Sequence, residues 1–219
     1  MPQTDTSRIL EGYEVLACLA WMRAKAAPGK RKRPSKMAEL NMIVFRLSSA
    51  YGLRRKEIVG LNMGDITLSG SRPSIHIRAA ITKASSTGQR HGRRVRLRWD
   101  RFAMADVAAW YQRRIAMGAQ PTDPFVCSLS GKKTGERLSW DNVRHHWRTA
   151  LTPLGEDRAN QVSIHQGRHS FCSHAIATGR SLSQVRDAAG HASVGTTNIY
   201  AHALANDDDF RDLYGSDQA

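Results

Sequence analysis

Residues 165–202 read HQGRHSFCSHAIATGRSLSQVRDAAGHASVGTTNIYAH and concentrate basic residues around a single tyrosine. His165 and Arg168 are three residues apart, so on one turn of a helix they point to the same side. His191 follows a glycine and precedes Tyr200 by nine residues. Capping residues and glycines divide the stretch into three short helices, which can fold these side chains into one site.

These residue types suit chemistry at a phosphodiester. A guanidinium group can hold two non-bridging oxygens with parallel hydrogen bonds, and imidazoles donate or accept protons near neutral pH. A tyrosine hydroxyl, with a pKa of about 10 when free, can form a covalent phosphotyrosyl ester if cations stabilise the transition state. This chemistry requires no metal and no cofactor.

The pattern resembles the tyrosine recombinase, or phage integrase, family. The second signature box of that family reads His-x-x-Arg-His, then Leu-Gly-His, then Thr-Thr-x-x-Tyr-x-His. Here the matching segments are residues 165–169, Ala189-Gly190-His191 and residues 196–202, read as TTNIYAH. By this resemblance, Tyr200 is the nucleophile.

The first box of the family lies upstream in the expected order. It appears as GLRRKEI at residues 52–58, followed by Leu61 and Asp65-Ile66, which makes Arg54 the first catalytic arginine. The family places a lysine on a β-hairpin between the boxes. Lys83 fits this role, although Arg90, Arg93 and Arg94 are near it in the sequence.

The resemblance implies a mechanism for site-specific DNA strand exchange. Tyr200 attacks the phosphodiester, forming a 3′-phosphotyrosine and freeing a 5′-hydroxyl, and a second 5′-hydroxyl then attacks that intermediate. In this scheme the roles are phosphate binding by Arg54 and Arg168, proton transfer from the tyrosine by His165, protonation of the leaving oxygen by Lys83 and a further hydrogen bond from His191. Tetramers on two DNA duplexes, with accessory DNA-bending proteins, are the implied assemblies.

Composition agrees with a DNA partner. The 219 residues include 33 Lys and Arg against 19 Asp and Glu, which gives a net charge of +14. Such a charge favours binding to nucleic acid, although membrane-surface proteins share it. Three widely spaced cysteines argue against a disulfide framework, and no apolar run or signal peptide indicates a membrane. We therefore expect a cytoplasmic protein that associates with the nucleoid when it acts.

The hydrophobic pattern predicts a mainly α fold with a small antiparallel β-sheet (α+β). Helices are expected over residues 9–26, from Ser35 towards Gly52, after Asp100 to Met117 and after Ser139, with strands within residues 66–97. The expected core-facing positions include Leu16, Met37 and Ile115, and the helical tryptophans are expected to pack in the core rather than stack on bases.

The expected organisation is an N-terminal helix and basic linker (1–34), a catalytic core (35–205) and a C-terminal tail (206–219). The resemblance spans residues 8–205 and includes no full N-terminal core-binding domain, as in small single-domain members such as fimbrial phase-variation invertases, or in a shortened piece of a longer protein. In the family, the tail packs on a neighbouring subunit; folding back on its own domain is equally compatible.

Several other interpretations stay open at this point. A catalytically silent DNA-binding regulator could keep this fold, and a type IB topoisomerase-like relaxer uses similar residues. The i, i+4 pair His165 and His169 could in principle bind zinc, but no Cys, Asp or Glu nearby completes a ligand set. Gly167 replaces the usual leucine of the family, which predicts the loss of a packing anchor beside Arg168.

Overall fold

The computed structural model describes residues 8–27, 35–84 and 88–191. Its α-helices are α1 (Gly12–Ala26), α2 (Lys36–Ser49), α3 (Arg55–Gly60), α4 (Arg101–Ala116), α5 (Trp140–Ala150), α6 (Glu156–Gln161), α7 (Ile164–Ala177) and α8 (Leu182–Ala189). The strands are β1 (Ile66–Thr67), β2 (Ser74–Ile77) and β3 (Arg93–Arg96). A short 3₁₀ helix, η3 (Ala79–Ile81), lies between β2 and β3, and another, η4 (Leu97–Trp99), lies between β3 and α4.

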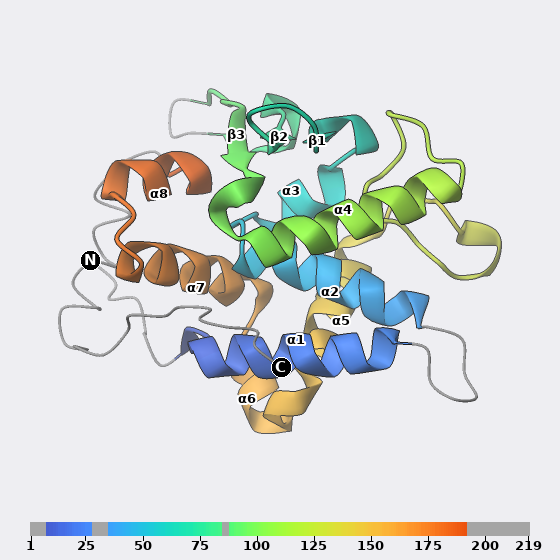
Figure 1. The fold of residues 1–219 in the computed structure, drawn as a ribbon, viewed down its shortest axis with the longest axis horizontal. Helices are drawn as coiled ribbons and strands as arrows, with labels where there is room; N and C mark the ends of the chain where they lie inside the picture. The colour runs from blue at the N-terminus through green and yellow to red at the C-terminus, as the bar shows by residue number, and fades with distance from the viewer. Residues whose placement is uncertain (1–7, 28–34, 85–87, 192–219) are drawn as a thin grey trace.

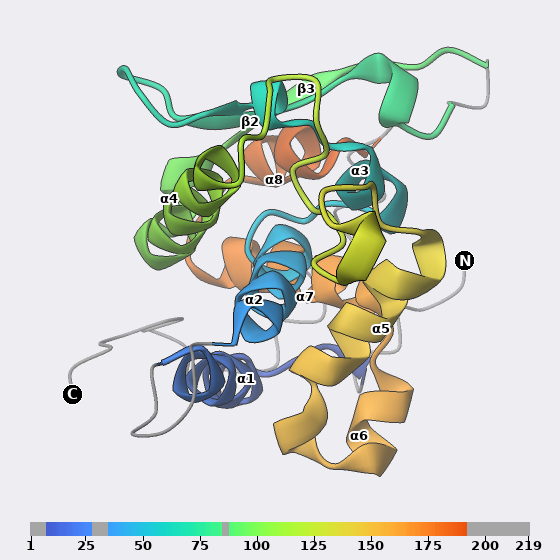
Figure 2. The same ribbon diagram turned by 90° about the vertical axis from the view of Figure 1, so that its right-hand side faces the viewer.

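Helix α2 is the centre of the fold. Its neighbours are α1, α4, α5 and α7, and Figure 2 shows it between α1 on one side and the sheet layer on the other. Eleven of its residues are buried, including polar ones such as Asn41 and Arg46. A helix buried on nearly all sides needs partners for its polar groups. Arg46 therefore binds the carboxylates of Asp100 and Asp106 at 3.2 and 2.8 Å.

The sheet is a small antiparallel layer above the helices (Figure 1). Its strand order is β1-β2-β3, with Ile66 opposite Ile75 and Ile75 opposite Val95. Since side chains alternate between the faces of a strand, this register directs three apolar side chains into the core. The expected α+β class, with strands between residues 66 and 97, is confirmed.

Local capping chemistry sets most helix boundaries. Ser35 accepts a hydrogen bond from the Ala38 N–H, and Asp100 accepts from the N–H groups of Phe102 and Ala103. Side-chain oxygens at these positions satisfy backbone donors that the first turn of a helix leaves free. The predicted starts after Ser35, Asp100 and Ser139 are confirmed, whereas the first helix begins at Gly12 rather than at residue 9.

Three expected core positions are wrong. Leu16, Met37 and Ile115 have exposed fractions of 37%, 41% and 48%. Leu16 lies about 100° around the helix from Val15 and falls outside the buried stripe of α1. Met37 and Ile115 lie in the terminal turns of α2 and α4, which extend beyond the core.

The N-terminal helix α1 packs against α2, and its Glu14 binds Arg158 of α6 through a side-chain contact of 2.7 Å. In the part of the chain that the structure describes, no helix is both long enough and apolar enough to cross a membrane.

One buried histidine makes stability depend on pH. The Nδ1 atom of His146 on α5 lies 2.7 Å from the Asn41 side-chain oxygen, and burial followed by the nearby charge of His145 lowers the pKa of His146 to about 4. The unfolded chain has a histidine pKa of about 6.5. Because the unfolded chain binds the proton more tightly, this contribution to stability is present above pH 6.5 and is lost as the pH falls towards 4.

We therefore expect His146→Gln to flatten the dependence of the thermal midpoint on pH between about 6.5 and 4, the window set by the two pKa values. Circular dichroism melts at half-unit pH intervals measure this slope. The exposed neighbour His145→Gln is the control and should keep most of the wild-type slope. Equal slopes for wild type and His146→Gln would contradict the assignment.

Candidate active site

Arg54 is placed by a sharp corner between α2 and α3. The corner needs a glycine, because Gly52 has φ of +65° and a Cβ there would lie 2.4 Å from the Phe171 ring. Arg54 then occupies the N-cap of α3 in an extended conformation. Its Nη2 donates to the Gly190 carbonyl at 3.2 Å, so this residue contacts the segment that follows α8.

Arg168 reaches the same corner from α7. Its side chain is buried, its Nη1 donates to the Gly52 carbonyl at 2.7 Å, and its Nη2 has no hydrogen-bond partner among the described residues. Burial, followed by repulsion from Arg54, lowers the pKa of Arg168 to about 10. A buried guanidinium donor without a partner is costly unless an anion binds it. The geometry is that of an anion site.

Two histidines of α7 lie near Arg168. The rings of His165 and His169 meet edge to face with centroids 4.5 Å apart. His165 is exposed, yet the surrounding protein removes part of its hydration, and this desolvation together with Arg168 and Arg54 lowers its pKa. The pKa of His169 is lowered to about 4 by burial, then by His165 and Arg168. Both rings are therefore neutral at pH 7.

His191 approaches from the end of α8. Gly190 adopts a left-handed conformation with φ of 67° and ψ of 49°, and the His191 N–H donates to the Arg186 carbonyl at 3.1 Å. This glycine ends the helix in the usual way for a left-handed cap. Burial, then Arg168 and Arg54, lowers the pKa of His191 to about 3.

Lys83 lies on the connection between β2 and β3 and is exposed. It lines a cavity of about 580 Å³ together with Arg54 and His165, and α5 supplies Trp140 and Arg144 to the same wall. The structure thus brings Arg54, Lys83 and His165 around one cavity, and it links Arg54 to Arg168 and His191 through backbone carbonyls of Gly52 and Gly190. Tyr200 lies outside the described residues.

Trp140 corrects the expectation that the helical tryptophans pack in the core. Trp110 and Trp147 are buried as expected, but Trp140 has an exposed fraction of 47% and carries the Arg55 guanidinium 4.5 Å above its ring. The reason is its position as the first residue of α5, where the helix extends past the core.

A buried carboxylate, that of Glu57, binds both Arg54 and Arg93. Glu57 on α3 is fully buried and accepts hydrogen bonds from Arg93 at 2.7 and 2.9 Å and from Arg54 Nη1 at 3.2 Å. Although burial raises the pKa of Glu57, hydrogen bonds and charge from Arg93 and Arg54 outweigh it and lower the pKa. Glu57 is therefore ionised and holds both guanidinium groups.

Arg93 also contacts the end of α8. Its Nε donates to the Ala188 carbonyl at 2.7 Å, and a Cβ on Gly190 would lie 2.9 Å from its Nε. Sequence patterns missed this residue. One signal was available, because Arg93 shares its strand face with the apolar Val95, and an arginine on an inward face requires a buried partner.

Gly167 does not leave a gap beside Arg168, contrary to the expected loss of a packing anchor. A Cβ at this position would lie 2.3 Å from the Trp147 ring and 2.7 Å from Ser48 Oγ. Trp147 fills the space that a leucine would occupy and is fixed by its own Nε1–H bond to the Val162 carbonyl at 2.9 Å. Helix α7 can approach α2 and α5 closely because residue 167 has no side chain.

Within the described ranges, no group of three or more His, Cys, Asp or Glu side chains could hold a metal ion. The pair His165 and His169 is therefore not part of a larger ligand cluster there.

Comparisons with known proteins identify the family of this chain. The sequence profile of the phage integrase family matches residues 22–207, and the chain belongs to this family. Tyrosine recombinase XerD of Pseudomonas aeruginosa is 28% identical over 153 residues, covering 70% of this chain and 46% of the relative. Tyrosine recombinase XerC of Proteus mirabilis is 30% identical over 151 residues, covering 69% and 43%. The chain spans about half the length of the curated relatives it matches.

Solved structures show the same fold. The crystal structure of XerA recombinase has a TM-score of 0.64 at 19% identity, covering 92% of this chain and 62% of that one. XerH site-specific recombinase bound to its difH substrate in a pre-cleavage complex has a TM-score of 0.58 at 19% identity, covering 90% and 51%. The predicted family and fold are confirmed.

The arginine pair around Glu57 gives a stability prediction. Arg93→Met should destabilise the fold by about 3–5 kcal/mol, the usual cost of removing one partner from a buried ion pair. Adding Glu57→Gln should restore part of this loss, because the uncompensated charge is removed. Urea unfolding of the two single variants and the double variant measures the coupling. Arg113→Met, at the partly exposed Glu39 pair, is the control and should cost about 0–1 kcal/mol.

The contact between Gly167 and Trp147 gives a second prediction. Gly167→Ala should destabilise the fold by about 1–3 kcal/mol, since overpacking displaces neighbours in a tight core. The clash involves the outer ring atoms of Trp147, which phenylalanine lacks. Trp147→Phe combined with Gly167→Ala should therefore cost less than the sum of the single changes in urea unfolding. Simple additivity would rule out the proposed close contact.

Proposed function

We propose that this chain cleaves and rejoins DNA strands in site-specific recombination through a 3′-phosphotyrosyl intermediate on Tyr200. The main support is the buried Arg168 guanidinium, whose Nη2 lacks a partner among the described residues, beside a second guanidinium on Arg54. Two guanidinium groups at one corner suit a phosphodiester, whose negative charge is shared by two non-bridging oxygens.

In the proposed cleavage step, the Tyr200 hydroxyl oxygen attacks phosphorus and the bond from phosphorus to the 5′ oxygen breaks. Arg54 and Arg168 hold the non-bridging oxygens as the charge on them increases. His165, neutral at pH 7 before DNA binds because its pKa is lowered, can accept the phenol proton. Lys83 donates a proton to the departing 5′ oxygen, and His191 supplies a further hydrogen bond.

Rejoining is the reverse of this step with a new nucleophile. A 5′-hydroxyl attacks the phosphotyrosine and gives its proton to Lys83, the phosphodiester is re-formed, and the departing Tyr200 oxygen takes a proton back from His165. The covalent ester conserves the energy of the broken bond, so exchange between strands requires no ATP. We further propose that four chains assemble on two duplexes and that accessory DNA-bending proteins assist assembly, as the family resemblance implies.

Covalent trapping tests this proposal. Nicked duplexes taken from the sequence around the gene would be incubated with wild type, Tyr200→Phe and Arg168→Lys, and adducts resolved on denaturing gels and mapped to a peptide. We expect a wild-type adduct at Tyr200, none for Tyr200→Phe and a rate lower by about 10²–10³ for Arg168→Lys, the usual loss when a charge-stabilising donor is removed. The exposed Tyr13→Phe is the matched control and should react normally.

Two other outcomes would favour different functions. DNA binding by wild type without any adduct would indicate a silent regulator. Relaxation of supercoiled DNA by a monomer without site preference would indicate a topoisomerase-like relaxer.

A further inference from the structure

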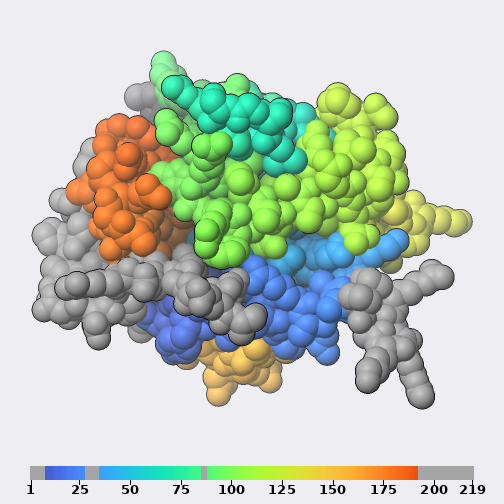
Figure 3. Space-filling view, viewed as in Figure 1, coloured from blue at the N-terminus to red at the C-terminus, as the bar shows by residue number. Residues whose placement is uncertain are grey.

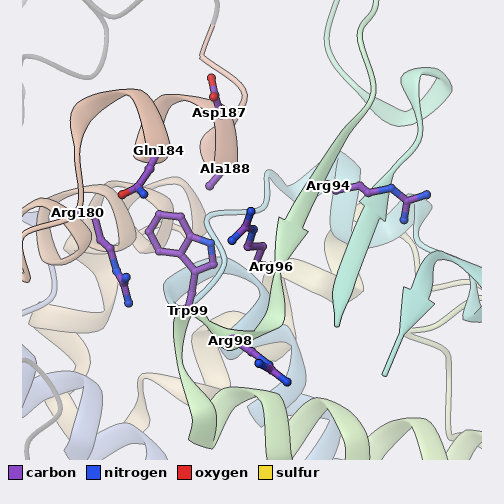
Figure 4. A pocket seen from close by; sticks show the side chains of 8 residues that line it. All are labelled: Arg94, Arg96, Arg98, Trp99, Arg180, Gln184, Asp187 and Ala188. Atoms are coloured by element: carbon purple, nitrogen blue, oxygen red, sulfur yellow. The ribbon is translucent and has the colours of Figure 1, made fainter. Parts of the chain in front are cut away.

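A second concave surface lies between α8 and the end of β3 (Figure 4). It has a volume of about 370 Å³ and shares no lining residue with the cavity of Arg54, Lys83 and His165. We call it the arginine groove; its lining residues are Arg94, Arg96, Arg98, Trp99, Arg180, Gln184, Asp187 and Ala188. Figure 3 shows the surfaces of α8 and of the β3–α4 segment meeting on one face of the molecule.

The groove carries positive charge that no carboxylate of the described residues pairs with. All four of its arginines are exposed, and none forms an ion pair within the described residues. The carboxylate in the groove, that of Asp187, is already bound by Arg186 at 2.7 Å. Four like charges around one hollow repel one another, so an anionic ligand would be stabilised there.

The strand geometry spreads these charges. Arg93 and Val95 face the core, so Arg94 and Arg96 face outwards, about 6.6 Å apart along the strand. Arg98 follows on η4, and Arg180 comes from the turn before α8. A row of separated guanidinium groups suits an extended polyanion with several phosphates better than one small anion.

The surroundings of Trp99, the aromatic residue in the groove, indicate whether the groove would bind single-stranded or duplex DNA. Trp99 packs against Phe171, with ring centroids 5.3 Å apart, and Arg180 lies 5.4 Å from its ring. Figure 4 shows Arg180 beside this ring. Proteins that bind single strands use open aromatic faces to stack bases. Because Trp99 already has neighbours, the groove favours contact with a phosphate backbone and does not favour base stacking.

We propose that the arginine groove is a second, sequence-independent binding surface for the phosphate backbone of duplex DNA, separate from the cavity around Arg54. This inference depends on the proposed function in one respect, namely that DNA is the substrate. The phosphates can belong to the flank of the duplex held at the candidate active site or to a second duplex. Either source provides the same backbone chemistry.

The test compares two variants of the full chain with the same change in net charge. The groove variant replaces Arg94, Arg96, Arg98 and Arg180 by alanine. The control variant replaces four exposed lysines outside the groove by alanine; these are Lys25, Lys36, Lys132 and Lys133. Fluorescence anisotropy with a labelled 60-base-pair duplex of arbitrary sequence gives Kd from 50 to 300 mM salt.

The slope of log Kd against log salt reports phosphate contacts, at about 0.9 per contact. We expect the groove variant to lower this slope by about 2–4 units relative to wild type, and the control to change it by less than about 1. Replacing the same four arginines by lysine should restore most of the slope. If the quadruple alanine variant fails to fold, Arg96→Ala with Arg98→Ala is measured instead, with an expected drop of about 1–2 units.

Duplex length separates the two sources of phosphate. If the groove binds the flank of the duplex held at the candidate active site, shortening the duplex to about 15 base pairs should remove the difference in salt slope between wild type and the groove variant. If it binds a second duplex, wild type but not the groove variant brings differently labelled short duplexes together in a pull-down. Equal slopes for the groove and control variants on long DNA would overturn the proposal.

An acidic peptide is the competing ligand. A labelled peptide copying residues 206–219, which contain five aspartates, would be titrated into wild type and the groove variant. Binding lost only in the groove variant, with its DNA slope unchanged, would assign the groove to a peptide and overturn the DNA assignment. Adduct formation on the nicked substrate is read separately, so failure of the proposed function is distinguishable from failure of the groove.

Discussion

The ionised Glu57 carboxylate, buried between two guanidinium groups, is the constraint on which the candidate site depends. It joins three segments that are distant in sequence, since Arg54 is the N-cap of α3, Arg93 begins β3, and Arg93 also donates to the Ala188 carbonyl at the end of α8. A buried carboxylate is stable only with such partners. Glu57 therefore sets the position of Arg54 directly. Through Arg93, it also sets the position of the segment that leads to His191.

Close backbone approach provides the second constraint. The Gly52 carbonyl accepts the hydrogen bond of Arg168, while Phe171 of α7 packs where a side chain at position 52 would be. One turn earlier on α7, Gly167 admits the Trp147 ring. These two glycines let α7 pack closely against α2 and α5. The close packing brings Arg168 to the corner between α2 and α3, where Arg54 lies. The arginine pair is thus set by packing as much as by charge.

The sequence predicts those parts of the structure that depend on local chemistry. Helix starts at Ser35 and Asp100 follow from capping and were predicted. The end of the first of these helices towards Gly52 was also predicted, and the structure adds the positive φ of Gly52 and of Gly190. Motif spacing also named Arg54, Lys83, His165, Arg168 and His191, of which the structure places the first three around one cavity. Motif spacing did not indicate Arg93, because the ion pair with Glu57, 36 positions away, is not part of either motif. The alternation that places Arg93 on the same strand face as Val95 was the available signal.

Packing partners explain the other differences. Gly167 was interpreted as a missing anchor, since nothing in the sequence shows that Trp147 fills the space. Trp140 and Ile115 follow the apolar period of their helices, yet both lie in terminal turns beyond the core, and periodicity does not specify where the core ends. Tyr200 stays a prediction from its motif, because it lies outside the described residues.

The division of charge between arginines and histidines has a consequence for how the site would respond to DNA. Desolvation, followed by the charges of Arg168 and Arg54, lowers the pKa of His165 and of His191. A bound phosphodiester would oppose part of the repulsion that these arginines exert on an imidazolium, so the pKa of each histidine would rise towards the working pH. The histidines could then hold a proton only when the phosphate is in place. Proton transfer would thus depend on substrate binding, without any separate switch in the protein.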